Sequence, residues 1–359
     1  MDSNETISKL SEFLEKVPQI DLRHIELLSN HTGIFQHATF NIPNYHHGYC
    51  LDDNSRALLL LLMATDIEPI LLENRLIPIY LSYIYYAQNK DGSFRNFMSY
   101  DLKFLEENGS DDSLGRTVWA VGYLLSQPKF SKYHAITKEI FDQGSKHIEK
   151  IKSVRAIAYC VLGIAFFLEN KPNDNHYLRL LENLIGFLKA EYKSANGPDW
   201  QWYEEIISYD NAIIPFSLLK AGKILGDSDL VNIGLESFSF LDKIYFKNGY
   251  LSPVGNEDWF KKGESSSDFG QQPIEVLSIL LLYDEATHYN TSIHCEEKIY
   301  LAFLWYLGVN IKKESLFDFN NMACYDGLES YGCNKNQGAE SNIAFWTSYV
   351  IIKKYFNSI

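Results

Sequence analysis

The sequence predicts an all-α protein built as a closed toroid of six helical hairpins, an (α/α)6 barrel. Two observations indicate it. Helical periodicity recurs along the whole chain without a competing alternating β pattern, and buried helices alternate with amphipathic ones at a regular interval. The chain has 359 residues, 46% hydrophobic and 22% charged, so it can bury a large core and is too apolar for disorder. No linker divides it, and we expect a single domain over residues 1–359.

Six segments are apolar on all sides, which is typical of helices that are buried on every face. They begin near Asp53, Asp112, Ser153, Asp210, Gln272 and Glu340. With Arg155 as the marker of the third segment, the successive starts lie 59, 43, 55, 62 and 68 residues apart. A repeat of ~57 residues holds one buried helix, one amphipathic helix and two loops. The alternative, an open α-solenoid, would not need the long polar loops of this chain.

Five amphipathic helices alternate with the buried ones, over Pro69–Ala87, Tyr133–Lys150, Asn175–Tyr192, Asp227–Tyr245 and Thr291–Leu307. Pro69 suits a first helical position, whereas Pro78 is expected to kink or break its helix. A further helix within residues 4–28 is expected to supply the sixth outer partner. The N-terminal segment 1–30 would then close the outer ring.

Charge and cysteine content exclude several classes of function. The formal net charge of −14 argues against a nucleic-acid partner and against an anionic membrane surface. The apolar stretches, such as Ala57–Ala64, are far shorter than the roughly 20 residues of a membrane span, and no signal peptide is visible. Five cysteines without a CxxC pair favour a reducing cytoplasm. We expect no cofactor and no metal, because His46-His47 lacks a spaced partner and no nucleotide-binding fingerprint occurs.

Polar clusters precede five of the six buried helices. Helix capping is one interpretation, since Asp, Asn and Ser satisfy free N–H groups in the first turn. The other is a shared site, because the inner helices of a toroid all start at the same end and their first turns converge. The clusters lie at 52–56, 111–113, 209–211, 271–272 and 336–340.

Arginine and tryptophan collect at the same positions. The chain has only seven Arg against 25 Lys, and Arg56, Arg116 and Arg155 lie in the first turns of three buried helices. They could bind substrate hydroxyls, or pair with neighbouring Asp to hold the ring together. Aromatic residues make up 14% of the chain. Loop tryptophans near this rim are expected to serve as sugar-stacking platforms or as loop anchors.

These segments resemble the six-hairpin glycosidase superfamily of (α/α)6 enzymes, over about residues 40 to 350. The similar motifs read HHGYCLDDNSRA, NFMSYD, SDDSLGR, WQWYEEIISYDNA, FGQQPIE and NQGAES. The chain looks most like bacterial members that occur beside, or fused to, glycosyltransferases. The resemblance implies a carbohydrate-active enzyme, a glycoside hydrolase acting on an oligosaccharide or glycoconjugate, and a functional association with glycosyltransferases.

Glycoside hydrolysis needs one protonated carboxylic acid and one carboxylate, and an inverting enzyme separates them by roughly 6.5–9.5 Å to admit a water. We expect Glu204 to be the acid, because neighbouring aromatic residues raise a carboxyl pKa by desolvation. Asp53 or Glu340 is expected to be the base, with Asp112 as a close rival. The candidate catalytic residues are Asp53, Asp112, Glu204, Asp210 and Glu340. The candidate substrate-binding residues are Asn54, Arg56, Arg116, Trp200, Trp202, Asn211, Trp259, Gln272 and Gln337.

Two alternatives stay open at this point. A sugar epimerase or isomerase on the same toroid would use histidine as its acid and base, with His46, His47 or His134 as candidates. A non-catalytic glycan-binding partner of a glycosyltransferase would bind sugar without turnover.

Overall fold

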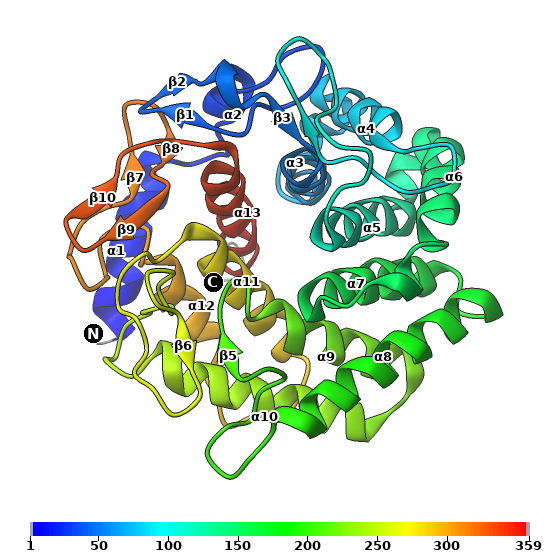
Figure 1. The fold of residues 1–359 in the computed structure, drawn as a ribbon. Helices are drawn as coiled ribbons and strands as arrows, with labels where there is room; N and C mark the ends of the chain where they lie inside the picture. The colour runs from blue at the N-terminus through cyan, green and yellow to red at the C-terminus, as the bar shows by residue number, and fades with distance from the viewer. Residues whose placement is uncertain (1–2, 357–359) are drawn as a thin grey trace.

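The computed structural model describes residues 3–356 and shows the predicted closed ring of helices (Figure 1). Each of the six inner helices contacts the next, and the last contacts the first, so the ring closes. The (α/α)6 fold class is therefore confirmed. The inner helices are α3 (Leu51–Ala64), α5 (Asp111–Ser126), α7 (Val154–Asn170), α9 (Ile213–Leu225), α11 (Pro273–Ala286) and α13 (Ala339–Phe356).

The outer layer contains the sixth helix that the sequence analysis expected near the N-terminus. Helix α1 contacts α12, and the ring of Phe13 packs against Phe345 and Tyr349 of α13. A short helix, α2 (Arg23–Leu27), also contacts α13. The outer helices are α1 (Ser3–Lys16), α4 (Leu76–Ala87), α6 (His134–Ser145), α8 (Asn175–Ala195), α10 (Ser228–Tyr245) and α12 (Cys295–Phe303).

Several helix boundaries differ from the predicted ones. The segment expected to be one helix over Pro69–Ala87 is a 3-10 turn, η2 (Pro69–Glu73), followed by α4. Pro78 does not break α4, because it is the third residue of that helix and its missing N–H falls in the first turn, where no intrahelical acceptor exists. Further 3-10 turns are η1 (Tyr45–His47), η3 (Pro128–Tyr133) and η4 (Ile148–Lys150).

Short antiparallel strand pairs, which the sequence analysis did not predict, lie in the loops that lead into the inner helices. Each strand has two or three residues, too few for an alternating hydrophobic pattern to appear. They brace the rim loops. The pairs are β1 (Ala38–Thr39) with β2 (Ile42–Pro43), β3 (Tyr49–Cys50) with β4 (Phe97–Met98), β5 (Ile206–Ile207) with β6 (Phe260–Lys261), β7 (Phe317–Asp318) with β8 (Ala323–Cys324), and β9 (Gly327–Glu329) with β10 (Gly332–Asn334).

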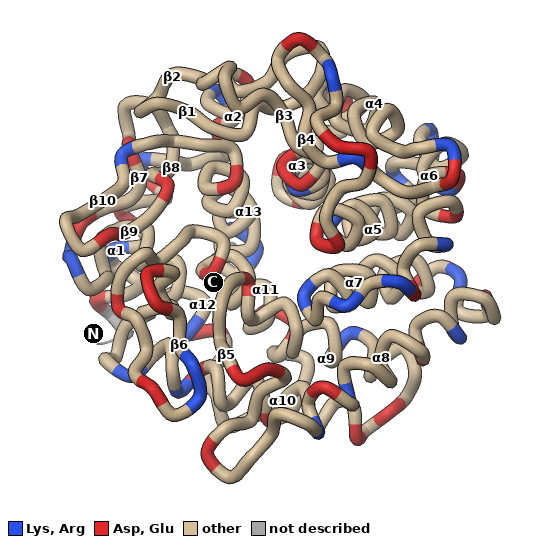
Figure 2. Tube along the Cα trace, viewed as in Figure 1, with Lys and Arg blue, Asp and Glu red and all other residues tan. Residues whose placement is uncertain are grey.

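Acidic residues gather around the centre of the ring. Figure 2 shows them at the starts of α3, α5 and α13, where these helices face the axis. Within residues 3–356, none of the helices combines the length and the apolar character that crossing a membrane requires.

Two glycines allow the close approach of α5 and α7. A Cβ atom at Gly163 would meet the backbone oxygen of Val118, and a Cβ at Gly122 would meet that of Gly163. The two helix backbones therefore touch without intervening side chains. By contrast, a Cβ at Gly186, on the outer helix α8, would meet open space.

We expect Gly163→Ala to lower the free energy of unfolding by about 1–3 kcal/mol, because the added methyl group pushes α5 and α7 apart. The matched control is Gly186→Ala, which is expected to raise stability by about 0.5–1 kcal/mol through helix propensity. Urea unfolding followed by circular dichroism measures both. Equal effects of the two substitutions would contradict the close contact between α5 and α7.

Candidate active site

The acids at the helix starts are not the helix caps. The side chains that cap α3, α5 and α7 are those of Cys50, Ser110 and Ser153. Helix α11 has no side-chain cap, because the preceding Gln272 makes no capping bond. Of the two interpretations of the polar clusters, the structure therefore favours convergence on a shared site over capping.

A cavity of about 710 Å³ opens at this end of the toroid. Its wall is formed by the first turns of inner helices and by the rim loops that precede them. Acids, amides and aromatic rings line it. The lining residues include Gln36, His37, Asp52, Asp53, Arg56, Phe97, Arg116, Tyr209, Asn256, Trp259, Gln272, Asp326, Glu329, Asn334, Asn336 and Glu340.

The guanidinium of Arg116, on α5, lies at the centre of the largest charge network. One of its nitrogens is 3.1 Å from a carboxylate oxygen of Asp52 and 3.5 Å from one of Asp112. The other is 3.6 Å from Asp210 and donates to the hydroxyl of Tyr159 at 2.7 Å. Tyr159 in turn donates to Asp210. Arg116 is only 7% exposed, so these partners replace its water shell.

A second guanidinium, that of Arg56 on α3, joins two candidate catalytic carboxylates. It lies 2.8 Å from Asp53 and 2.7 Å from Glu340. The Asp53 carboxyl is buried, and its second oxygen accepts from the thiol of Cys50 at 3.1 Å. The side chain of Glu340 is 38% exposed. One guanidinium therefore connects a buried carboxyl with a carboxylate that faces water.

Asp210 is held by contacts to both its side chain and its backbone. Its φ of 46° is in the left-handed region, which is uncommon for a residue other than glycine. The backbone N–H of Asp210 and that of Asn211 donate to the carboxylate of Glu275, on α11. Glu275 also accepts from Tyr245 at 2.6 Å. These bonds hold the strained turn in place.

Burial raises the pKa of several of these carboxyl groups. Desolvation is the largest effect on Asp53, Asp210 and Asp326, and it raises the pKa of each above its usual value. Burial and the nearby Asp210 charge raise the pKa of Glu275 to about 7, while hydrogen bonds from Tyr245 and the backbone act in the opposite direction. Glu275, which does not itself line the cavity, can therefore hold a proton near neutral pH.

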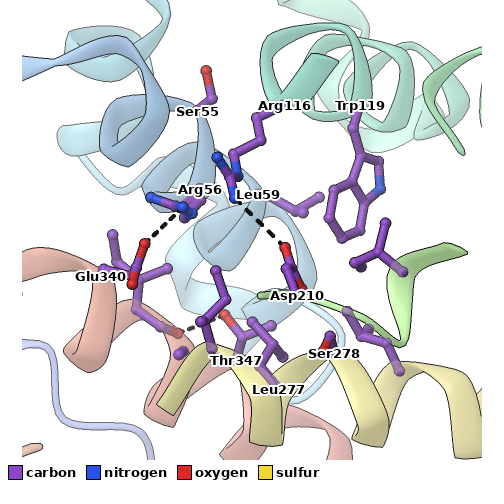
Figure 3. A pocket seen from close by; sticks show the side chains of 15 residues that line it. Ser55, Arg56, Leu59, Arg116, Trp119, Asp210, Leu277, Ser278, Glu340 and Thr347 are labelled. Atoms are coloured by element: carbon purple, nitrogen blue, oxygen red, sulfur yellow. Dashed lines mark hydrogen bonds and ion pairs between the residues drawn. The ribbon is translucent and has the colours of Figure 1, made fainter. Parts of the chain in front are cut away.

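A small apolar cavity of about 40 Å³ lies along the axis beneath the charged layer. Figure 3 shows Arg56 pointing to Glu340 and Arg116 pointing to Asp210 at its edge. Aliphatic side chains such as Leu59 and Leu277 form most of its remaining wall, together with the ring of Trp119 and the hydroxyl side chains Ser55, Ser278 and Thr347. The ion pairs thus form the floor of the larger cavity and cover an apolar core.

Several predicted site residues line the large cavity, namely Asp53, Arg56, Arg116, Trp259, Gln272 and Glu340. Asp210 lines the small cavity beneath them. Asp112 accepts a hydrogen bond from Tyr209 at 2.7 Å, so it lies behind the wall.

Other predicted residues are placed elsewhere, and their expected roles need correction. Trp202 and Trp200 are 0% and 4% exposed and pack in the core with Phe240, so neither offers a face to a sugar. Glu204 pairs with Arg155 at 2.5 Å and does not line the cavity. Arg155 is 3% exposed and also binds Asn211.

Three predicted amide residues are structural. Asn54 and Asn211 are fully buried, and each bonds to nearby backbone groups. Gln337 is 1% exposed and donates to Asp318. The amides of Asn54 and Asn211 thus satisfy backbone groups of the rim loops, whereas the oxygen of Gln337 is buried without a hydrogen-bond partner. His134, a candidate of the epimerase alternative, lies at the start of outer helix α6 and bonds to the backbone oxygen of Gln127.

Four further residues build the site but were not among the predicted catalytic or substrate-binding residues. Glu275 was detectable as an acid within the otherwise apolar start of α11, and Asp52 as the neighbour of Asp53. Tyr159 looks like a core residue in its apolar helix. Asp326 lies in a loop, and no local pattern marks it.

Within residues 3–356, no group of three His, Cys, Asp or Glu side chains is arranged to hold a metal ion.

In sequence, the chain matches no family model and no curated protein. It is similar in structure to a sugar epimerase from a ruminal bacterium, with a TM-score of 0.72, 13% identity and 96% of each chain covered. A GH76 α-mannanase of Bacteroides thetaiotaomicron has a TM-score of 0.65 and 11% identity, over 99% of this chain and 100% of that chain.

A D-mannose isomerase is also similar, with a TM-score of 0.65 and 13% identity over 97% of this chain and 98% of that chain. All three have the six-hairpin (α/α)6 fold. At these identities the likeness establishes that the chain shares the fold of these proteins.

Glu275 is expected to make stability depend on pH. Its pKa is raised from 4.5 to about 7 on folding, so the stabilisation is fully present below pH 4.5 and is lost as the pH rises through about 7. Across this range the free energy of unfolding should fall by about 3 kcal/mol more in the wild type than in Glu275→Gln. Urea unfolding at a series of pH values measures this difference.

Glu73→Gln, on the exposed outer surface, is the control and should follow the wild type at every pH. Glu275→Gln replaces one acceptor oxygen with an NH2 group, so the variant also loses a hydrogen-bond acceptor at every pH. The test therefore uses how the difference in the free energy of unfolding between wild type and variant changes with pH. A difference that stays constant from pH 5 to pH 8 would contradict the raised pKa.

Proposed function

We propose that this protein is a carbohydrate-active enzyme that hydrolyses a glycosidic bond with a pair of carboxyl groups. One observation carries the proposal: carboxyl groups in unlike environments line one cavity that also contains amides and aromatic faces. Hydrolysis needs such a difference, because one group must hold a proton while the other is ionised. By analogy, the GH76 α-mannanase with the same fold supports hydrolysis, whereas the sugar epimerase supports only a carbohydrate-active enzyme.

Asp326 is the proposed general acid, in place of Glu204. One of its oxygens accepts from the N–H of Gly338 and the hydroxyl of Ser341, at 2.7 and 2.8 Å. The second oxygen is the one available to carry a proton. Burial raises the pKa of Asp326, as an acid acting near neutral pH requires.

Glu340 is the proposed general base. Arg56 binds one of its oxygens, which leaves the other to take a proton from water. Its partial exposure gives that water access. Asp53, on the other side of Arg56, fixes the guanidinium and remains a second candidate for the base. A water delivered by Glu340 would attack directly, so the reaction is proposed to invert the anomeric configuration.

The rings of Trp259 and Tyr209 line the cavity, and their centroids lie 6.5 Å from each other. They are the proposed stacking surfaces for sugar rings. The amides of Gln272, Asn256 and Asn336 line the same cavity and would hydrogen-bond to sugar hydroxyls. Of the three tryptophans predicted to bind sugar, only Trp259 keeps that role in this proposal, and Tyr209 is added to it.

A pair of consecutive aspartates matters in one enzyme of similar structure. An α-1,6-mannanase of Salegentibacter, at a TM-score of 0.61, is inactive when two consecutive aspartates are replaced by alanine. This chain has two such pairs, Asp52-Asp53 and Asp111-Asp112, and Arg116 binds one member of each. We propose that these pairs organise the floor on which the reaction takes place.

A second candidate function is sugar epimerisation, because His37 lines the cavity and its ring lies 4.6 Å from that of His47. Two imidazoles could exchange a proton with a sugar carbon. Product analysis separates the two reactions, since hydrolysis releases a shorter glycan and epimerisation leaves the glycan length unchanged. Binding without any turnover would instead indicate a non-catalytic glycan-binding protein.

We also propose a bacterial, cytoplasmic protein of one domain that works beside a glycosyltransferase. Its five cysteines are all free and buried, which supports a reducing compartment.

We expect Asp326→Asn and Glu340→Gln each to lower turnover of a cleaved glycan by about 10²–10⁴-fold, because each removes a proton-transfer group. An aryl glycoside with an activated leaving group should restore turnover in Asp326→Asn alone, since such a group departs without protonation. A glycan-library screen with mass detection identifies the substrate for these assays.

Glu73→Gln is the folded control, and thermal unfolding checks each variant. Glu204→Gln tests the assignment made from sequence: a loss of turnover there, with Asp326→Asn fully active, would contradict the proposed acid. NMR of the first product gives the anomeric configuration.

A further inference from the structure

We infer that the cavity selects uncharged glycans and that water, rather than phosphate, receives the glycosyl group. The inference rests on the proposed function and deepens it. The arrangement of charge carries it: both arginines of the described cavity wall already bind carboxylates of the protein itself.

The two arginines of the wall already have carboxylate partners. Arg56 is bound by Asp53 and Glu340. Arg116 is bound by Asp52, Asp112 and Asp210, and by a tyrosine hydroxyl. Over the part of the chain that the structure describes, no lysine lines the cavity. A substrate carboxylate or phosphate could reach either guanidinium only by displacing a partly buried carboxylate and leaving it unpaired, which is costly.

The helix starts, the other common anion-binding element, are partly occupied as well. Helix N-termini attract anions through their free N–H groups and dipoles. The caps of α3, α5 and α7 each accept from one of these N–H groups, and α11 begins with Pro273, which has no N–H to offer. The N–H groups of Asp210 and Asn211, ahead of α9, donate to Glu275. Gly338, ahead of α13, donates to Asp326.

The remaining charge on the wall is negative. Five acids line the cavity, against the two arginines and His37. Glu329 is one of the five, and burial together with the nearby Glu257 carboxylate raises its pKa. An anionic sugar would meet these groups at close range, where like charges repel by several kcal/mol. A neutral glycan needs only hydroxyl acceptors, donors and ring faces, all of which the wall supplies.

The test uses one glycan in three forms. The neutral glycan that binds best in an array of neutral and anionic members is oxidised at its primary hydroxyls to the uronate, and part of the uronate is converted to its methyl ester. The ester is larger than the uronate but uncharged, so it separates charge from size. Calorimetry at pH 7.5 and low salt is expected to give an affinity for the uronate at least about tenfold weaker than for the ester.

Salt and one substitution identify the cause. Added salt should narrow the difference between ester and uronate, because it screens charge. Glu329→Gln should narrow it too, whereas Glu73→Gln, the same change on the outer surface, should not. A uronate that binds as tightly as its ester, or a gap that Glu329→Gln leaves unchanged, overturns the inference.

The acceptor is tested by running the reaction in phosphate buffer and in a phosphate-free buffer of equal ionic strength. We expect free reducing sugar to be the only sugar product released, and to form at the same rate in both buffers. Formation of a sugar 1-phosphate overturns the inference, and so does an array in which only anionic glycans bind. In both cases the protein would still be a carbohydrate-active protein. An array in which no glycan binds overturns the proposed function and this inference together.

Discussion

The guanidinium of Arg116 joins four of the six inner helices at the floor of the cavity. It extends from α5, where Asp112 also lies, to Asp52 of α3, Tyr159 of α7 and Asp210 ahead of α9. A buried cation is tolerated only when its partners replace its hydration, and its partners here come from different helices. The contacts that stabilise this buried charge therefore also fix the relative positions of the helix starts, and with them the carboxyl groups of the candidate site.

The same principle extends around the ring. Arg56 connects α3 with α13 through Glu340, and Glu275 connects α11 with the turn at Asp210. Six helix starts converge on one axis, and their dipoles would create a strongly positive centre. The excess of acids over arginines offsets that field. The left-handed backbone at Asp210 fits this account, because strained residues persist only where their surroundings determine them fully.

The fold was predictable because it depends on a property that repeats. Each buried helix is apolar on every side, so six starts and a sixth outer partner follow from the sequence. The site was only partly predictable. Arg56, Glu340 and Asp53 could be found because they occupy first turns. Trp202 and Glu204 were misplaced because a loop sequence does not show which way its side chains turn. Asp326 could not be found, since only the closing of the ring brings its loop to the cavity.

The division of labour between helix starts and loops explains why this fold suits a carbohydrate enzyme. The charged floor stands on the first turns of helices packed on every side, so its geometry is rigid. The ring of Trp259 and the amide of Asn256 come instead from a rim loop that a two-residue strand pair braces. Changes in this loop can alter the contacts to a sugar without moving the carboxyl groups of the floor. The proposed acid Asp326 lies in another loop, which Ser341 ties to the start of α13. Under the proposed function, the floor together with the loop of Asp326 would determine the reaction type, and the rim loop of Trp259 would determine the choice of glycan. One toroid could support different carbohydrate chemistries in this way.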